Sequence, residues 1–214
     1  MPDNMTKERI SILKAYGAQV VLTPAAEKMP GAVKKALELQ SQIENSFIPQ
    51  QFENPASPAI HRVTTAPEIL QQTEGRLYVF VATAGTGGTI TGTGEALKGH
   101  LPNLQVIVVE PKGSPVLSGG VPGPHKLVGT SPGFVPAVLN TDVYDEIVQV
   151  ADEHAIQITR DLARLEGILV GPSAGAAVWT AIQKARVLGP GKRVLCIAPD
   201  NGERYLSMEG MFDQ

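Results

Sequence analysis

The chain has 214 residues, of which 43% are hydrophobic and 18% charged, and this composition excludes a disordered chain. Its net charge is −3 and it has no basic run, so neither nucleic acid nor a membrane surface is an expected partner. Cys196 is the only cysteine, which excludes an intramolecular disulfide and a cysteine-rich zinc site. No apolar run approaches the ~18 residues of a membrane span, and no apolar signal core is present at the N-terminus, so we expect a cytoplasmic protein.

Helix and strand patterns alternate along the chain. The first part shows a helix over 6–16, with Ile10, Leu13 and Tyr16 on one face, a short strand over 18–23 and a helix over 31–44 with Val33 and Leu37 inward. The later helices are expected around 59–71 and over 89–99, 152–166 and 174–188, and the later strands over 77–84, 104–109, 145–150, 168–170 and 193–198. This alternation predicts an α/β fold with a mostly parallel sheet.

The strand over 18–23 has no neighbour in its own part of the chain, although a single strand is not stable alone. It either joins the edge of the main sheet or belongs to the trailing part of another domain. The sequence leaves both possibilities open.

A glycine-rich loop follows the apolar strand over 77–84 and precedes a helix. It consists of Gly85, Thr86, Gly87, Gly88 and Thr89. Three glycines let backbone N–H groups approach a ligand, and the helix start adds unpaired donors, so the loop predicts a phosphate site. A dinucleotide fingerprint needs a third glycine where Ile90 stands, although Glu110 resembles its ribose-binding acid. A P-loop lysine is absent too, so we expect a single phosphate ester.

Ser173 lies in a Gly-x-Ser-x-Gly run between a predicted strand and a helix. This matches the nucleophile elbow of hydrolases, but those need a histidine after the serine, and all four histidines precede Ser173. The hydroxyl is therefore expected to hydrogen-bond a ring atom of a ligand or to cap the helix beginning at Ala174, and the two roles are compatible.

A polar loop over 50–55 contains Gln51 and Asn54, whose amides suit a carboxylate ligand. The histidines have no metal-ligand spacing, so no metal site is expected. Cys196 lies in an apolar strand and is expected to be an inert core thiol.

Together these loops resemble the cysteine synthase (O-acetylserine sulfhydrylase) family, whose cofactor is pyridoxal 5′-phosphate (PLP). The matching runs are QQFENPASPAIH, GTGGTITG, VVEP, GPHKLVGTSPGFVP, EGILVGPSAGAA and GERYLS, in the family's order over nearly the whole chain. The resemblance implies the tryptophan-synthase-β-like fold (fold type II). It divides the chain into 1–54, the trailing part of the substrate-side domain, and 55–214, a complete three-layer domain that binds the PLP phosphate.

The resemblance also implies an activity: β-replacement of the acetate of O-acetylserine by sulfide to give L-cysteine. In this comparison Gly85, Thr86, Gly87, Gly88 and Thr89 hold the phosphate, Ser173 contacts the pyridine nitrogen and Gln51 binds the carboxylate of the amino-acid substrate. The loop Gly129–Phe134 borders the entrance and is less glycine-rich than in many members. The family also implies a homodimer and a partner, the C-terminal tail of serine acetyltransferase.

One family feature is absent from this sequence. None of the ten lysines has the context of the Schiff-base lysine, and the loop that grips the substrate carboxylate is missing too. We therefore expect no catalytic residue in this chain and no activity from it alone, and PLP binding by it alone is left open. The alternatives are a non-catalytic protein that binds a phosphate ligand or a partner and, within the family, a cystathionine β-synthase or a phosphoserine sulfhydrylase.

Overall fold

The computed structural model describes residues 1–212. Its regular elements, in chain order, are α1 (Lys7–Ala15), the 3₁₀ turn η1 (Ala25–Glu27), α2 (Lys28–Gln42), α3 (Ala56–Val63), α4 (Thr65–Thr73), β1 (Val79–Thr83), α5 (Gly88–His100), β2 (Gln105–Pro111), β3 (Glu146–Val150), α6 (Asp152–Glu166), α7 (Pro172–Leu188), β4 (Val194–Cys196) and the 3₁₀ turn η2 (Gly202–Tyr205).

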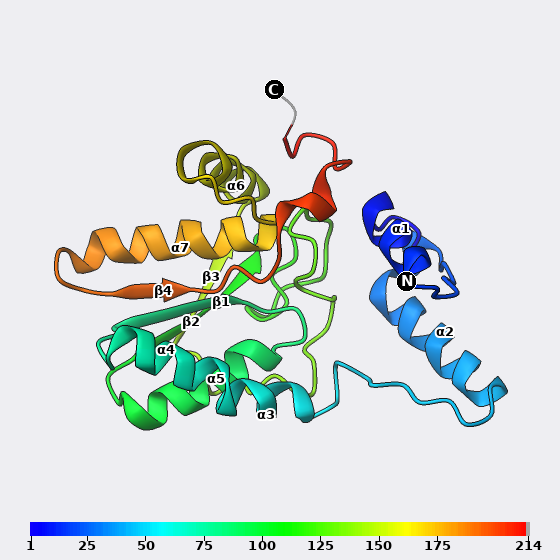
Figure 1. Cartoon of the computed structure of the whole chain (residues 1–214), viewed down its shortest axis with the longest axis horizontal. Coiled ribbons are helices and arrows are strands. Elements are labelled where there is room, and N and C mark those ends of the chain that lie inside the picture. Colours follow the sequence, from blue (N-terminus) through cyan, green and yellow to red (C-terminus); the bar gives the residue numbers. More distant parts are fainter. Residues whose placement is uncertain (213–214) are drawn as a thin grey trace.

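Four parallel strands form the central sheet, in the order β3-β2-β1-β4. The two middle strands, β1 and β2, are almost wholly buried, which explains their continuous apolar runs. Helices α3, α4 and α5 cover one face of the sheet, and α6 and α7 cover the other (Figure 1). The predicted three-layer α/β domain with a parallel sheet is therefore confirmed.

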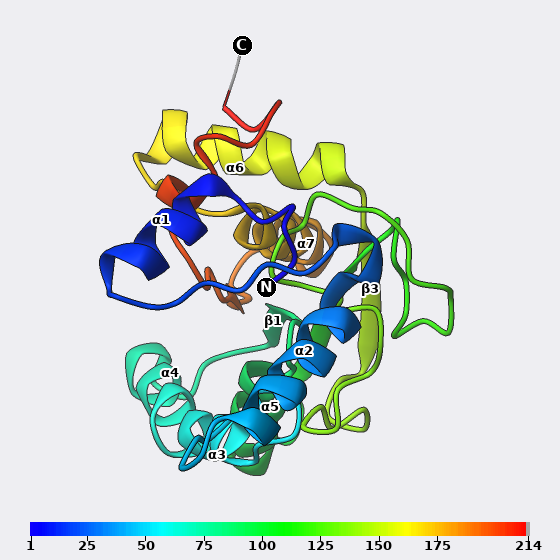
Figure 2. The same cartoon turned by 90° about the vertical axis from the view of Figure 1, so that its right-hand side faces the viewer.

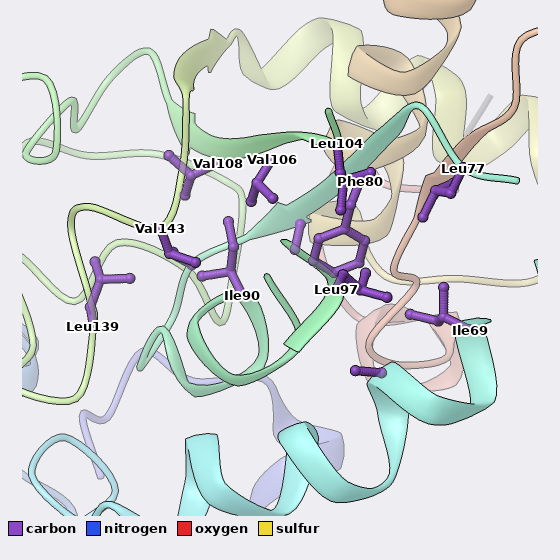
Figure 3. Close-up of a cluster of buried hydrophobic side chains, with 13 residues drawn as sticks. Ile69, Leu77, Phe80, Ile90, Leu97, Leu104, Val106, Val108, Leu139 and Val143 are labelled. Carbon is purple, nitrogen blue, oxygen red and sulfur yellow. The ribbon is translucent and has the colours of Figure 1, made fainter. Parts of the chain in front are cut away.

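Successive side chains of β1 alternate between two cores. Phe80 points to the α5 side and packs with Ile90 and Leu97 of that helix (Figure 3). Val81 points to the other side, into a cluster with Ala176 and Ala177 of α7. The face of α7 that packs on the sheet thus includes small residues, whereas α5 packs on it with larger aliphatic side chains.

Helix α5 contains several glycines, which are poor helix formers, and close packing explains two of them. A Cβ on Gly92 would lie 2.0 Å from the carbonyl oxygen of Pro58 in α3, and one on Gly94 would lie 2.9 Å from Cγ2 of Val143. Both positions therefore require glycine, and α5 packs close to its neighbours.

The N-terminal part lies apart from the sheet. Helices α1 and α2 stand in front of the carboxyl ends of the strands and connect to α3 through an extended segment (Figures 1 and 2). Helix α1 has no buried residue, and Tyr16 and Leu37, predicted to face inward, are 85% and 51% exposed. The predicted strand over 18–23 was wrong: among the described residues, only Thr23 forms a bridge there, with Pro2.

Two further boundaries differ from the predictions. The helix expected around 59–71 is two helices, α3 and α4, interrupted at Thr64. Pro67 explains the interruption, because a proline lacks the N–H that would continue the helical ladder back to Val63. The strand expected over 168–170 was also wrong. Of these residues only Val170 pairs, in an isolated bridge with Asn201, and the strand at that edge of the sheet, beside β1, is β4.

Candidate functional site

A cavity of about 850 Å³ lies between the N-terminal part and the carboxyl ends of the strands. Open parallel sheets bind their ligands at this end. Its walls come from several parts of the chain that are distant in sequence. Among them are the start of α1 (Thr6 and Lys7), the loops after β1 and β2 (Gly85, Thr86 and Ser114), and the segment 122–133.

The glycine-rich loop lies in this cavity where β1 passes into α5. Gly87 is the N-cap of α5 with φ +87°, a left-handed conformation that favours glycine. Gly85 and Thr86 line the cavity. A Cβ on Gly85 would lie 2.3 Å from the carbonyl oxygen of Gly129, so the two loops are in direct contact. The first turn of α5 thus presents N–H groups that have no acceptor within the helix.

The two threonines of this loop have different surroundings. The hydroxyl of Thr86 accepts a long hydrogen bond (3.4 Å) from the N–H of Gly88. The hydroxyl of Thr89 lies 3.1 Å from Nε2 of His61, whose Nδ1 is 2.8 Å from the hydroxyl of Thr65. Burial lowers the pKa of His61, which keeps this imidazole neutral. Thr89 therefore anchors the start of α5 to α3, and of the two hydroxyl residues only Thr86 lines the cavity.

Ser173 is the second residue of α7. The helix begins at Pro172, two residues earlier than predicted. Gly171 is the N-cap, with no side-chain capping bond, so the capping role predicted for Ser173 was wrong. Ser173 is only 4% exposed. The first turn of α7 lies on the same side of the sheet as the carboxyl ends of the strands (Figure 1). Ser173 is not among the residues that line the cavity.

The polar loop over 50–55 carries three side-chain amides, those of Gln50, Gln51 and Asn54, in different surroundings. Asn54 builds the turn, because its Nδ2 donates to the carbonyl of Pro49 (2.8 Å) and its Oδ1 accepts from the N–H of Ala56 (2.9 Å). Gln51 is exposed and lines the cavity. Gln51 is therefore the amide available to a ligand.

The loop Gly129–Phe134 closes one side of the cavity, beside the glycine-rich loop. Ser131 fixes it: its N–H donates to the carbonyl of Ala84 (3.0 Å) and its hydroxyl donates to the carbonyl of Ser114 (2.9 Å). Phe134 packs edge-to-face on Phe52, with ring centroids 5.0 Å apart. The loop thus contacts both the end of β1 and the segment before α3.

Glu110 has a structural role. Its side chain is 2% exposed and accepts hydrogen bonds from the N–H of Leu117 (2.8 Å) and from the N–H (3.2 Å) and hydroxyl of Ser118. The carboxylate therefore holds the turn that follows β2. Glu110 resembled a ribose-binding acid in the sequence only because it stands at the end of a strand.

Five cationic or titratable residues of the cavity were not singled out from the sequence: Lys7, Arg9, Lys28, His125 and Lys126. The three lysines are exposed. Nδ1 of His125 is buried without a partner among the described residues, and burial lowers the pKa of its imidazole. In the sequence, the only sign of His125 and Lys126 was the run GPHK at Gly123–Lys126, which is part of the family-like run GPHKLVGTSPGFVP.

In the described part of the chain, no group of histidine, cysteine, aspartate or glutamate side chains is arranged to hold a metal ion. No helix there is long and apolar enough to cross a membrane.

Comparison with protein families matches residues 1–200 to the pyridoxal-phosphate dependent enzyme family. A protein of Bacillus subtilis (strain 168) named "Probable cysteine synthase" is 64% identical over 212 residues, which are 98% of this chain and 68% of that protein. A cysteine synthase of Staphylococcus aureus (strain Mu50) is 54% identical over 208 residues, 97% of this chain and 67% of its own length. The chain thus spans about two thirds of these relatives.

Solved structures give the same result for the fold. The O-acetylserine dependent cystathionine beta-synthase of Helicobacter pylori superposes with a TM-score of 0.93 at 42% identity, covering 100% of this chain and 69% of that one. The cysteine synthase of Entamoeba histolytica superposes with a TM-score of 0.90 at 35% identity, covering 100% and 64%. Such agreement confirms the fold type II architecture expected from the sequence.

Proposed function

Because this chain belongs to the pyridoxal-phosphate dependent enzyme family, we propose that it serves in a cysteine synthase, which replaces the acetate of O-acetylserine by sulfide to give L-cysteine. The observation that carries the proposal is the glycine-rich loop at the start of α5, which opens into the cavity. When bound, PLP supplies an electron sink for the α-carbon of an amino acid. The chain's own residues bind and orient it.

The cradle fits the phosphate of PLP. Gly85 has no room for a side chain beside Gly129, and Gly85 and Thr86 place the backbone of this loop at the cavity wall. The N-terminus of α5 adds the positive end of the helix dipole. We assign phosphate binding to Gly85, Thr86, Gly87, Gly88 and Thr89, with Thr86 the hydroxyl donor that lines the cavity.

Ser173 is proposed to hydrogen-bond the pyridine nitrogen. Ser173 lies in the first turn of α7, at the end of the sheet where the cavity lies, and its hydroxyl is a donor that a ring nitrogen can accept. A neutral hydroxyl leaves that nitrogen unprotonated, which weakens the electron sink and favours elimination of a β-substituent. Gln51 is proposed to bind the substrate carboxylate, and the loop Gly129–Phe134 to border the entrance.

O-acetylserine is favoured over serine and phosphoserine as the substrate. The Helicobacter pylori relative, although a cystathionine beta-synthase, is described as O-acetylserine dependent. The two relatives of highest sequence identity reported above carry the name cysteine synthase. The non-catalytic alternative has no such support.

The chain alone is proposed to lack catalytic activity. The three lysines at the cavity wall, Lys7, Lys28 and Lys126, are exposed, whereas a lysine that condenses with a carbonyl needs a desolvated, positioned amine. Residues 1–54 are proposed to be the trailing part of the substrate-side domain and residues 55–214 the phosphate-binding domain. We also propose a cytoplasmic homodimer and the C-terminal tail of serine acetyltransferase as a partner.

A chimaera tests the activity. The part of the Bacillus subtilis relative outside the match is joined to these 214 residues and assayed with O-acetylserine and sulfide. We expect L-cysteine from the chimaera, a loss of activity with Gly85→Ala, and none from the 214 residues alone. A folded chimaera that binds PLP but makes no cysteine would contradict the proposed function.

Borohydride reduction tests the lysines separately. The 214-residue chain is incubated with PLP, reduced and digested, and its peptides are mapped by mass spectrometry. We expect no single lysine to retain the cofactor. Stoichiometric labelling of one lysine would contradict the proposed lack of a Schiff-base residue.

A further inference from the structure

Helix α1 keeps a defined place without a hydrophobic core. None of its residues is buried, yet its residues Lys7 and Arg9 form part of the cavity wall. Figure 2 shows α1 beside the C-terminal segment, drawn in red, that contains η2. Something other than apolar burial must therefore hold the helix there.

The first group of contacts joins Arg9 to two residues about 190 positions later. Nη2 of Arg9 donates to the hydroxyl of Tyr205 (2.6 Å) and lies 3.5 Å from Oδ2 of Asp200. The Tyr205 hydroxyl donates to the same carboxylate oxygen at 2.5 Å. The guanidinium also stands over the Tyr205 ring, 5.4 Å from its centroid. The three side chains form a closed triad.

Burial makes this triad stronger than an exposed ion pair. Tyr205 is fully buried, and only about a quarter of the side chains of Arg9 and Asp200 is exposed (29% and 21%). Burial and the neighbouring Asp200 raise the pKa of Tyr205 to about 12, so the phenol stays a neutral donor. Charge-assisted hydrogen bonds in such surroundings are stronger than bonds between neutral groups.

The preceding residue of α1 makes a second attachment. The two carboxylate oxygens of Glu8 accept from the N–H and from the hydroxyl of Ser207, each at 2.7 Å. The hydrogen bond from the Ser207 side chain holds the pKa of Glu8 below its ordinary value. Two adjacent residues of α1 are thus bonded to one short segment, residues 200–207.

Asp200 also contacts the start of α7. Its carbonyl accepts from the N–H of Gly171, the N-cap of α7, at 3.2 Å. A Cβ on Gly171 would lie 2.3 Å from Oδ1 of Asp200. Ser173 follows two residues later in the same helix. One carboxylate therefore lies between the helix of the cavity wall and the helix that carries Ser173.

We propose that Asp200 and Tyr205 are positioning residues that hold α1, through Arg9, as the cavity wall opposite the glycine-rich loop. We call Arg9, Asp200 and Tyr205 the α1 latch. The latch itself follows from the contacts alone, whereas its effect on PLP rests on the proposed function. Without the latch, α1 has no buried side chain and keeps only the Glu8–Ser207 hydrogen bonds to this segment, so the cavity wall that contains Thr6 and Lys7 is less firmly held.

The experiment breaks the latch at Arg9, its member on α1. Arg9→Met deletes the guanidinium on a helix that has no part in the core, so the sheet domain stays folded. Lys14→Met is the matched control, because it removes the same charge from the same helix at an exposed position. Arg9→Lys restores the charge and tests rescue. A thermal melt of each variant monitors the sheet domain.

Two readouts follow α1 without any ligand. Hydrogen exchange of residues 7–15 should accelerate at least about tenfold in Arg9→Met, remain unchanged in Lys14→Met and recover in part in Arg9→Lys. The distance between spin labels at Tyr16→Cys and Glu153→Cys, in a Cys196→Ala background, should broaden in Arg9→Met alone. Unchanged exchange and distance in Arg9→Met would overturn the latch.

A third readout tests the effect on the cavity. PLP is titrated into the unsubstituted chain and each variant, and we expect at least several-fold weaker binding in Arg9→Met with an unchanged melting temperature. Equal affinity would overturn the positioning role, even if α1 moves. If the unsubstituted chain binds no PLP, the proposed cradle is contradicted, while the exchange and distance readouts still decide the latch.

Discussion

Substituting Gly85 tests the contact between the two loops that form the cradle. In Gly85→Ala the new Cβ would lie 2.3 Å from the carbonyl oxygen of Gly129, and this oxygen belongs to backbone and cannot rotate away. One of the two loops must therefore move by about 1 Å or more. Overpacking of this kind costs about 1–3 kcal/mol. For a chain of this size, that cost corresponds to a fall in melting temperature of roughly 2–12 °C.

Gly99→Ala provides the control for this substitution. Gly99 is exposed, lies in the last turn of α5 and has nothing within 4 Å of the added Cβ. Alanine is the better helix former by about 1 kcal/mol, so Gly99→Ala should melt higher by up to about 4 °C.

The assay combines thermal unfolding, followed by circular dichroism, with PLP titration. We expect Gly85→Ala to melt lower and to bind PLP at least about tenfold more weakly, because the displaced loop carries the N–H donors. Gly99→Ala should bind PLP as the unsubstituted chain does. If both variants melt and bind alike, the reasoning about the close contact at Gly85 is refuted.

Three further predictions concern titration, reactivity and a buried acceptor. Burial lowers the pKa of His61, so the unfolded state binds more protons than the native state, and the free energy of unfolding should fall as the pH drops below the ordinary value of 6.5. Urea melts between pH 7.5 and 5 give this free energy at each pH, and its dependence on pH should be weaker in His61→Gln. An equal pH dependence in the variant would count against this reasoning. Burial raises the pKa of Cys196 to about 11, so at pH 8 a thiol reagent should label the native chain on the order of 100-fold more slowly than the chain in urea, and equal rates would contradict this. Glu110→Ala leaves the N–H groups of Leu117 and Ser118 without their acceptor and should cost about 1–3 kcal/mol in a denaturant melt, whereas the exposed control Glu53→Ala should cost nothing measurable; equal losses would contradict the capping role.

Strong periodicity made some elements predictable from the sequence. The apolar run around β1 could only be a strand buried on both faces, and the predicted helix over 152–166 matches α6 residue for residue. The glycine-rich loop lies between β1 and α5, as predicted, because Gly87 permits the left-handed turn that starts the helix. These elements were predictable because their structure depends on residues that are neighbours in the sequence.

Elements that depend on distant partners were not predictable in this way. Residues 18–23 have a strand composition, but only Thr23 finds a partner among the described residues. Glu110 and Ser173 both follow strand-like runs, yet Glu110 holds a turn and the helix of Ser173 is capped by Gly171. Nothing in the sequence indicates that Arg9 contacts Asp200 and Tyr205, because about 190 residues separate Arg9 from these two.

The phosphate cradle is the central claim, and amide chemical shifts test it most directly. The ¹⁵N-labelled chain is titrated with PLP, with inorganic phosphate and with pyridoxal, which lacks the phosphate. The account predicts that PLP and inorganic phosphate shift the same amides, those of Gly85 to Thr89, and that pyridoxal leaves them in place. Shifts by PLP that are absent from Gly85 to Thr89, or equal shifts there by pyridoxal, would contradict it.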